Sequence, residues 1–290
     1  MIACRAAGVR LVAATVRRVP RGTLSSQAAT LAAVLCAAVL WSGCAAVRRP
    51  VAAVPPPVLP TAAELQAVLA QRREHVRSLR ALAHIRYRDP EGSNSSRGAI
   101  AVARPDRLRV EVLSLFGSVF VLVADDGALT AYARQENTVY HGHASPENLW
   151  RYVRLTLPVH DLVDLVLGTP PPRQAEESRV SFDAPSGSIR LRQDSARGTQ
   201  MVWFSLAALP LSAEEQGADG QTQWRATFGD YEDQDGFALA THIALEVPGW
   251  QRSLEIALED IDLNPKLDPP VFAVQVPPGA KVVNLDSVAH

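Results

Sequence analysis

The hydrophobic pattern predicts one amphipathic helix followed by a long run of strands. Thr61 is placed to cap a helix and Glu64 to complete a capping box. Apolar residues then recur at helical spacing, so the sequence predicts a helix over about residues 62–78. After Leu79 the period changes from 3.6 to 2, which is typical of strands with one buried face. The segment Arg107–Val112 shows this well, because its charged and apolar residues alternate strictly.

Two short helices are predicted to interrupt the strands. Ser145-Pro146-Glu147 has the capping residue, the proline and the acidic residue of a helix start. Pro158 opens a second helix, and Gly168 ends it. Pro170–Pro172 then forces an extended exit, after which strands resume and continue to about residue 258.

These segments amount to about eleven strands and three helices, which is too much sheet for a flat layer. We therefore expect a mainly β (α+β) domain over residues 61–290. Its antiparallel sheet would curl strongly into an incomplete barrel, and the helices would close the mouth of the barrel as a lid.

The N-terminal region has a different character from the domain. Residues 1–43 hold five arginines and no acidic residue, and an apolar stretch follows the last of these arginines. A basic region, an apolar region and small residues are the pattern of a secretory signal. The run Trp41-Ser42-Gly43-Cys44 resembles a bacterial lipobox, although Trp41 stands where Leu is usual. We expect residues 1–43 to be a lipoprotein signal peptide and Cys44 to carry lipid; the alternative is an uncleaved anchor helix.

A proline-rich linker separates the lipidated cysteine from the domain. Residues 44–60 contain the run Pro55-Pro56-Pro57, which favours an extended, semi-rigid spacer. Such a spacer would hold the folded domain away from the membrane surface.

Composition and motifs argue against several other functions. The net charge of −1 gives no sign of nucleic-acid binding. His141 and His143 are the only close histidine pair and lack a third ligand nearby, so we expect no metal site. Nucleotide-binding and hydrolase motifs are missing from the sequence, so we expect neither a cofactor nor enzymatic activity.

Four passages of the domain carry a family resemblance. They are His75–Leu79, Arg107–Val112 with Leu115–Ser118, Leu157–Pro170, and Phe272 with Val276–Ala280. Together these passages resemble the LolA/LolB family of lipoprotein carriers, most closely LolB, over about residues 61–280. The long proline linker, the insert Glu214–Gly220 and the long C-terminus depart from LolB, and they leave open a relative with another cargo.

The resemblance implies an eleven-stranded incomplete barrel with a helical lid and an apolar cavity for the acyl chains of lipoproteins. It also implies that a soluble LolA-like periplasmic carrier delivers these lipoproteins for transfer to the outer membrane without catalysis. We expect a monomer that is anchored in the outer membrane by lipid and faces the periplasm. The alternative is a structural or sensory envelope lipoprotein that uses the same fold to bind another partner.

Apolar residues of the strands and helices are the candidates for lining such a cavity. A hollow interior would favour the carrier, whereas an interior filled by the protein's own side chains would favour the alternative. One alternate register would move some of the strand candidates to the other face. The candidates are Leu108, Val110, Val112, Val119, Val121 and Val123 in strands, and Leu149, Val153 and Leu162 in helices.

Leu115 and Phe116 lie between two predicted strands, where hairpin turns are normally polar. They are either core residues or an exposed apolar tip, and Gly117 closes the turn at once, which favours the tip. Phe116 matches the apolar residue of the protruding LolB loop. The resemblance therefore implies a tip that enters the membrane surface when cargo is handed over.

The lipid anchor gives a direct prediction. Replacing Cys44 by Ala removes the only thiol at which the signal pattern predicts acylation. Because each buried CH₂ of an acyl chain contributes about 0.8 kcal/mol, loss of the chains should release the protein from the membrane or leave an uncleaved precursor. Mass spectrometry and membrane fractionation of Cys44→Ala check this, and an unchanged mature mass would refute the anchor.

Overall fold

The computed structural model describes residues 58–153 and 157–287. The predicted signal peptide, Cys44 and most of the linker lie outside the described residues. In the described part, the helices are α2 (Ala62–His75), α3 (Pro146–Val153) and α4 (Val159–Val166), and short 3-10 turns cover Pro248–Trp250, Pro269–Phe272 and Leu285–Ser287.

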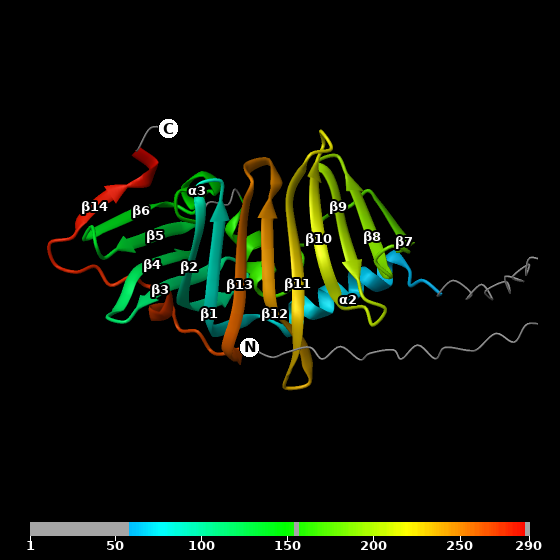
Figure 1. Cartoon of the computed structure of the whole chain (residues 1–290), viewed down its shortest axis with the longest axis horizontal. Helices are drawn as coiled ribbons and strands as arrows, with labels where there is room; N and C mark the ends of the chain where they lie inside the picture. The colour runs from blue at the N-terminus through cyan, green and yellow to red at the C-terminus, as the bar shows by residue number, and fades with distance from the viewer. Residues whose placement is uncertain (1–57, 154–156, 288–290) are drawn as a thin grey trace, which may run out of the picture. The chain divides into compact units, whose positions relative to one another are not determined.

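The described residues form fourteen strands in one sheet (Figure 1). In chain order the strands are β1 (Ser78–Asp89), β2 (Gly92–Ala103), β3 (Arg107–Ser114), β4 (Gly117–Asp125), β5 (Ala128–Ala133), β6 (Thr138–His143), β7 (Glu177–Asp183), β8 (Ser188–Ser195), β9 (Gly198–Phe204), β10 (Pro210–Gly217), β11 (Thr222–Gln234), β12 (Phe237–Val247), β13 (Arg252–Leu263) and β14 (Lys281–Asn284).

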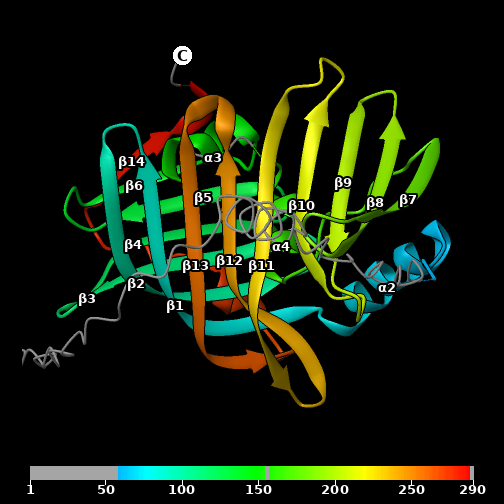
Figure 2. The same ribbon diagram turned by 45° about the vertical axis from the view of Figure 1, so that its right-hand side comes forward.

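Strand order across the sheet is β14-β6-β5-β4-β3-β2-β1-β13-β12-β11-β10-β9-β8-β7. The pairings are antiparallel except for β14, which pairs parallel with β6, so the sheet is mixed. Figure 2 shows that β3–β6 run across the direction of β1 and β7–β13, as expected when strand twist accumulates over a wide sheet.

The expected barrel is wrong in its closure, its curvature and its strand number. The sheet is open, with β14 and β7 at its two edges, and it is not strongly curled. Three strands, β1, β10 and β14, were not predicted as separate strands. Closure is unnecessary because helices and the C-terminal segment cover the apolar faces of the sheet.

The inner face of the sheet carries the main core and is covered by the helices. Leu65 and Leu69 of α2, Leu149 of α3 and Val163 and Leu165 of α4 join one contiguous cluster with the inward strand residues. The largest fully buried strand side chains in it are Leu79, Ile100, Leu108, Leu122, Leu129, Leu191 and Phe204. The helices therefore cover the inner face of an open sheet, whereas the sequence predicted that they close the mouth of a barrel.

A capping box and a buried arginine position α2. Thr61 Oγ1 accepts from the backbone N–H of Glu64 at 3.2 Å, and Glu64 Oε2 accepts from the backbone N–H of Thr61 at 2.7 Å, as predicted. The helix ends at His75, three residues earlier than predicted, because Val76 is already extended. Arg72 donates to the carbonyl of Ala238 at 2.8 Å, and burial lowers the pKa of Arg72.

The outer face has a smaller core beneath the C-terminal segment. Ala101, Ala103, Val121 and Val123 pack there with Leu267 and Phe272. The guanidinium of Arg107 lies 4.8 Å from the ring centroid of Phe272. After this segment, β14 joins the edge of β6.

No helix among the described residues is long and apolar enough to cross a membrane.

The hairpin between β8 and β9 depends on a glycine. Gly198 has a φ of +141°, and a Cβ at this position would lie 2.0 Å from the carbonyl oxygen of Gln216. We expect Gly198→Ala to lower the free energy of unfolding by about 1–3 kcal/mol or more. Gly229→Ala is the control, since a Cβ there meets no atom within 4 Å. Denaturant unfolding of both variants checks this, and equal stabilities would contradict it.

Candidate functional site

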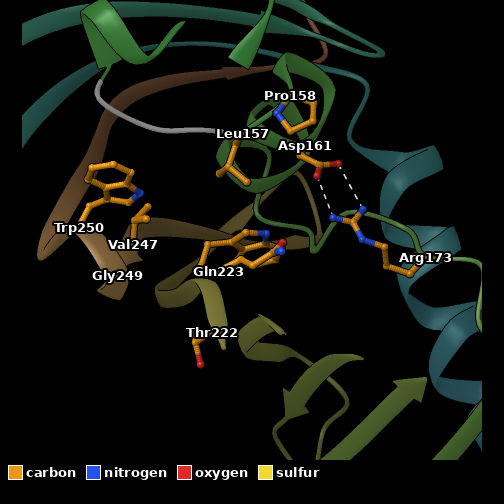
Figure 3. Close-up of a pocket in the computed structure, with 10 residues that line it drawn as sticks. Leu157, Pro158, Asp161, Arg173, Thr222, Gln223, Val247, Gly249 and Trp250 are labelled. Carbon is orange, nitrogen blue, oxygen red and sulfur yellow. Dashed lines mark hydrogen bonds and ion pairs between the residues drawn. The ribbon is translucent and has the colours of Figure 1, made fainter. Parts of the chain in front are cut away.

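A pocket of about 450 Å³ lies between the start of α4, strand β11 and the turn after β12 (Figure 3). We call it the Trp250 pocket. Trp250 is 54% exposed at its edge, whereas Trp224 is only 2% exposed. Its volume is within the range of about 300–1,000 Å³ that is typical of ligand sites. Its lining combines the apolar residues Leu157, Pro158, Trp224, Val247, Gly249 and Trp250 with the polar residues Asp161, Arg173, Thr222 and Gln223.

A second pocket, of about 380 Å³, lies between α2 and the segment that follows α4. We call it the Gln200 pocket. The side chains of Gln193 and Gln200 form part of its wall although these residues are only 5% and 2% exposed. Its full lining is Gln66, Leu69, Ala70, Arg73, Glu74, Pro170, Pro171, Pro172, Arg173, Gln193 and Gln200.

Arg173 lines both pockets and ties α4 to the sheet. Its Nη2 donates to Asp161 Oδ2 at 2.8 Å, and its Nε donates to Glu215 Oε2 at 3.1 Å (the Asp161 bonds are drawn in Figure 3). Burial alone would lower the pKa of Arg173, but Asp161 and Glu215 outweigh it and raise the pKa. Burial raises the pKa of Glu215, and Arg173 only partly opposes this.

A buried carboxylate fastens α4 to two other elements. Asp164 of α4 is 2% exposed and forms ion pairs with Arg73 of α2 and with Arg104 after β2. Burial first, and then the charge of Arg73, lowers the pKa of Arg104 to about 9. Arg104 also donates through Nε to the carbonyl of Val76 at 2.9 Å. Because Arg104 stays protonated at neutral pH, Asp164 holds α4 both to α2 and to the sheet.

The turn between β3 and β4 is an exposed apolar tip. Leu115 is 98% exposed and Phe116 is 90% exposed, so the prediction that they lie outside the core is confirmed. Ser114 Oγ accepts from the backbone N–H of Phe116 at 3.2 Å and donates to the carbonyl of Gly117 at 2.9 Å, which fixes this turn.

The predicted cavity residues fall into separate groups. Leu108, Leu149 and Leu162 are at most 4% exposed and belong to the inner core. Val110 packs against this core, and Val112 is half-buried on the same strand face. None of these five residues lines either pocket.

Val121 and Val123 belong to the outer core, so placing them on the same face as Leu108 is wrong. Their strand is apolar throughout, and alternation sends Leu122 inward and both valines outward. Val119 is half-buried beside a β-bulge. The side chain of Val153 and all of Cys44 lie outside the described residues.

Sequence reasoning considered Trp224 and Trp250 as cavity residues but missed the polar residues that line the two pockets. One signal was available, because Gln193 and Gln200 occupy positions in phase with apolar residues of their strands. Arg173 follows three prolines and had no pattern that set it apart.

The two histidines considered for a metal site have other partners. His143 Nδ1 lies 2.8 Å from Asp286 Oδ2, and His141 Nδ1 lies 3.2 Å from Thr130 Oγ1. Within the described ranges, no group of three or more His, Cys, Asp or Glu residues could hold a metal ion.

A family model described as outer membrane lipoprotein LolB matches residues 81–260. Solved structures with a similar fold include a domain described as an outer membrane lipoprotein-sorting protein from Vibrio parahaemolyticus, at 15% identity and a TM-score of 0.51. That match covers 73% of this chain and 97% of the other. A LolA superfamily protein from Nitrosomonas europaea is 13% identical, with a TM-score of 0.51 and coverage of 74% and 99%. No curated protein matches the chain at a significant level.

The fastening of α4 can be tested through Asp164. Asp164→Asn removes a buried carboxylate from two half-buried guanidinium groups, and breaking a buried ion pair in this way costs about 3–5 kcal/mol. We expect a loss of that size in the free energy of unfolding. Asp262→Asn is the control because its pair with Arg80 is largely exposed and should contribute at most about 1 kcal/mol. Equal losses of unfolding free energy in the two variants, measured by chemical denaturation, would show that Asp164 does not hold α4 in place.

Proposed function

The chain belongs to the LolB family, and from that premise we propose that it binds the acyl chains of lipoproteins beneath α4 and helps to insert them into the outer membrane. Family membership itself implies an outer-membrane lipoprotein that takes part in lipoprotein localization. It also implies a receptor family that is generally non-enzymatic, with lipoprotein substrates delivered by LolA.

The Trp250 pocket supports the binding step. Leu157, Val247 and Trp250 give it an apolar wall, and it opens beside the first turn of α4. The inner core continues from this region with Leu162 and Leu108. In the proposal, an acyl chain enters at the pocket and α4 shifts outward. The core residues then become the walls of the enlarged site.

The exposed tip is the single observation that carries the handover step. Neither Leu115 nor Phe116 packs against the protein, although each side chain would gain about 1.5–3 kcal/mol if it were fully buried. A membrane surface supplies the apolar phase that these side chains lack. The tip therefore brings the domain and the bilayer together during transfer.

The anchor in this proposal is lipid on Cys44, preceded by a signal peptide over residues 1–43. Burying two side chains at the tip is too weak to hold the domain on a membrane, whereas two or more acyl chains hold it stably. Residues 44–60 form the tether. The domain then acts as a monomer on the periplasmic side of the outer membrane.

One observation favours a second candidate function. Leu108, Leu149 and Leu162 are packed in the core, which fits an envelope lipoprotein that uses the fold to bind another partner. Mass spectrometry of lipid that co-purifies with the mature protein separates the two candidates. Bound acylated material supports the carrier, and its absence together with a captured protein partner supports the alternative.

The tip gives the test of the proposed function. We expect Phe116→Glu to keep the melting temperature of the wild type, because the side chain is 90% exposed. Transfer of a lipoprotein from a carrier to liposomes should slow several-fold while cargo binding persists, because a charged side chain at the tip disfavours insertion into the lipid interface. Transfer is measured in a timed flotation assay.

Leu206→Glu is the matched control, since Leu206 is 66% exposed in the turn between β9 and β10 and is not part of the tip. It should transfer cargo at the wild-type rate. Equal rates for all three proteins would reject the handover role, and a marked loss of stability in Phe116→Glu would show that the side chain is structural.

A further inference from the structure

The inner face of the sheet carries one row of polar residues at the Gln200 pocket. Gln193, Gln200 and Glu215 alternate in phase with the core residues of their strands, so they point to the same face as Leu191, Val202 and Ala213. Burying an amide side chain on an apolar face is unfavourable unless it is hydrogen-bonded. The presence of three such residues in one row therefore suggests that they serve binding rather than stability.

Strand register aligns these residues side by side. Ser178 lies opposite Gln193, Gln193 opposite Gln200, and Gln200 opposite Glu215. The row thus crosses β7, β8, β9 and β10 at one level, and α2 passes behind these strands (Figure 1). Gln66 of α2 donates to Ser178 Oγ at 3.2 Å, so the helix closes one side of the row.

The orientation of the Gln200 amide is fixed by its partners. Nε2 donates to the carbonyl of Pro171 at 3.1 Å and to Glu215 Oε2 at 3.2 Å. A carbonyl oxygen only accepts, so the nitrogen must face Pro171 and the oxygen must face the other way. That oxygen, Oε1, is buried and has no hydrogen-bond donor among the described residues. Because Gln200 lines the pocket, a small shift of its side chain would present this unpaired acceptor to a ligand that donates a hydrogen bond.

The charges around the pocket indicate which chemical class of ligand it can bind. Arg73 is paired with Asp164, and Arg173 is paired with Asp161 and Glu215. Both arginines of the lining therefore already lie against carboxylates, and Glu74 adds negative charge to the wall, which disfavours a phosphate or a free carboxylate in the pocket. A neutral polar group is favoured instead.

We propose that the Gln200 pocket binds an amide group next to an acyl chain, with the amide N–H donating to Gln200 Oε1. This inference rests on the proposed function, because it places the polar end of the acylated ligand beside the apolar part of the site. A lipidated protein presents amide N–H groups beside its acyl chains, whereas an ester-linked lipid presents only acceptors at the same position. Gln200 thereby distinguishes acylated protein from ester-linked lipid.

Two matched probes test the proposal with the full mature protein. N-palmitoylethanolamine carries an amide, and ethylene glycol monopalmitate carries an ester in its place, with the same chain and the same hydroxyl. We expect the wild type to bind the amide probe about tenfold more tightly, the value of one hydrogen bond. Titration calorimetry measures both affinities.

Gln200→Met removes the acceptor while keeping the length of the side chain, and it should bind both probes with equal affinity. Gln223→Met reports on the Trp250 pocket, which Gln223 lines, and it should keep the preference. Gln234→Met is the matched control, since Gln234 lies at the end of β11 and lines neither pocket, and it should keep both affinities of the wild type. A thermal melt of each variant accompanies the titrations.

The outcomes separate this proposal from the proposed function. Equal binding of the two probes by the wild type overturns the role of Gln200 and leaves acyl-chain binding intact. Binding of neither probe overturns both. Loss of the preference in Gln223→Met but not in Gln200→Met assigns the amide to the Trp250 pocket and overturns the proposal. Because the wild-type comparison needs no variant, a Gln200→Met protein that does not fold leaves the test decisive.

Discussion

An open sheet with an apolar face must be covered by something other than itself, and the rest of this structure depends on that constraint. A closed barrel would bury the inner face without help, but here β14 and β7 remain at separate edges. The short helix α4 supplies part of the cover, although eight residues have little helical stability alone. Asp164 compensates by pairing with Arg73 and Arg104, so charge and apolar packing together hold α4 in place.

The outer face of the sheet also has to be covered, and here the C-terminal segment provides the cover. Val121 and Val123 would be exposed on β4, and the segment after β13 crosses them with Leu267 and Phe272. The chain then adds β14 to β6 and anchors its end, where Leu285 is 3% exposed and Asp286 accepts from the backbone N–H of His143 at 3.1 Å. The family match ends at residue 260, so this cover lies beyond the matched region.

Alternation in the sequence was enough to predict a mainly β domain, and the capping box with helical spacing predicted its early helix. The exposed tip was favoured over the core only by the turn at Gly117 and by the family resemblance. Alternation could not place Val121 and Val123, because a strand that is apolar throughout does not reveal which face each residue takes. β10 was mistaken for an insert because Glu214 and Glu215 look like turn residues. Partners distant in sequence, Arg225 and Arg173, satisfy these two carboxylates within the sheet. Closure depends on what covers each face, and no local pattern contains that information.

Polar side chains interrupt the apolar inner face of the sheet at the Gln200 pocket. An interior meant only for stability would gain by replacing the Gln193–Gln200–Glu215 row with apolar residues, because each buried amide needs partners. The row instead lies where α2, the proline exit and the sheet meet, next to the apolar wall around Trp250. An amphipathic ligand needs this pairing of surfaces. In the proposed function, the acyl chain would lose water on one side of Arg173, and the polar group of the ligand would find hydrogen-bond partners on the other. A site divided in this way would bind an amphipathic ligand in one orientation, which is what the proposed function requires.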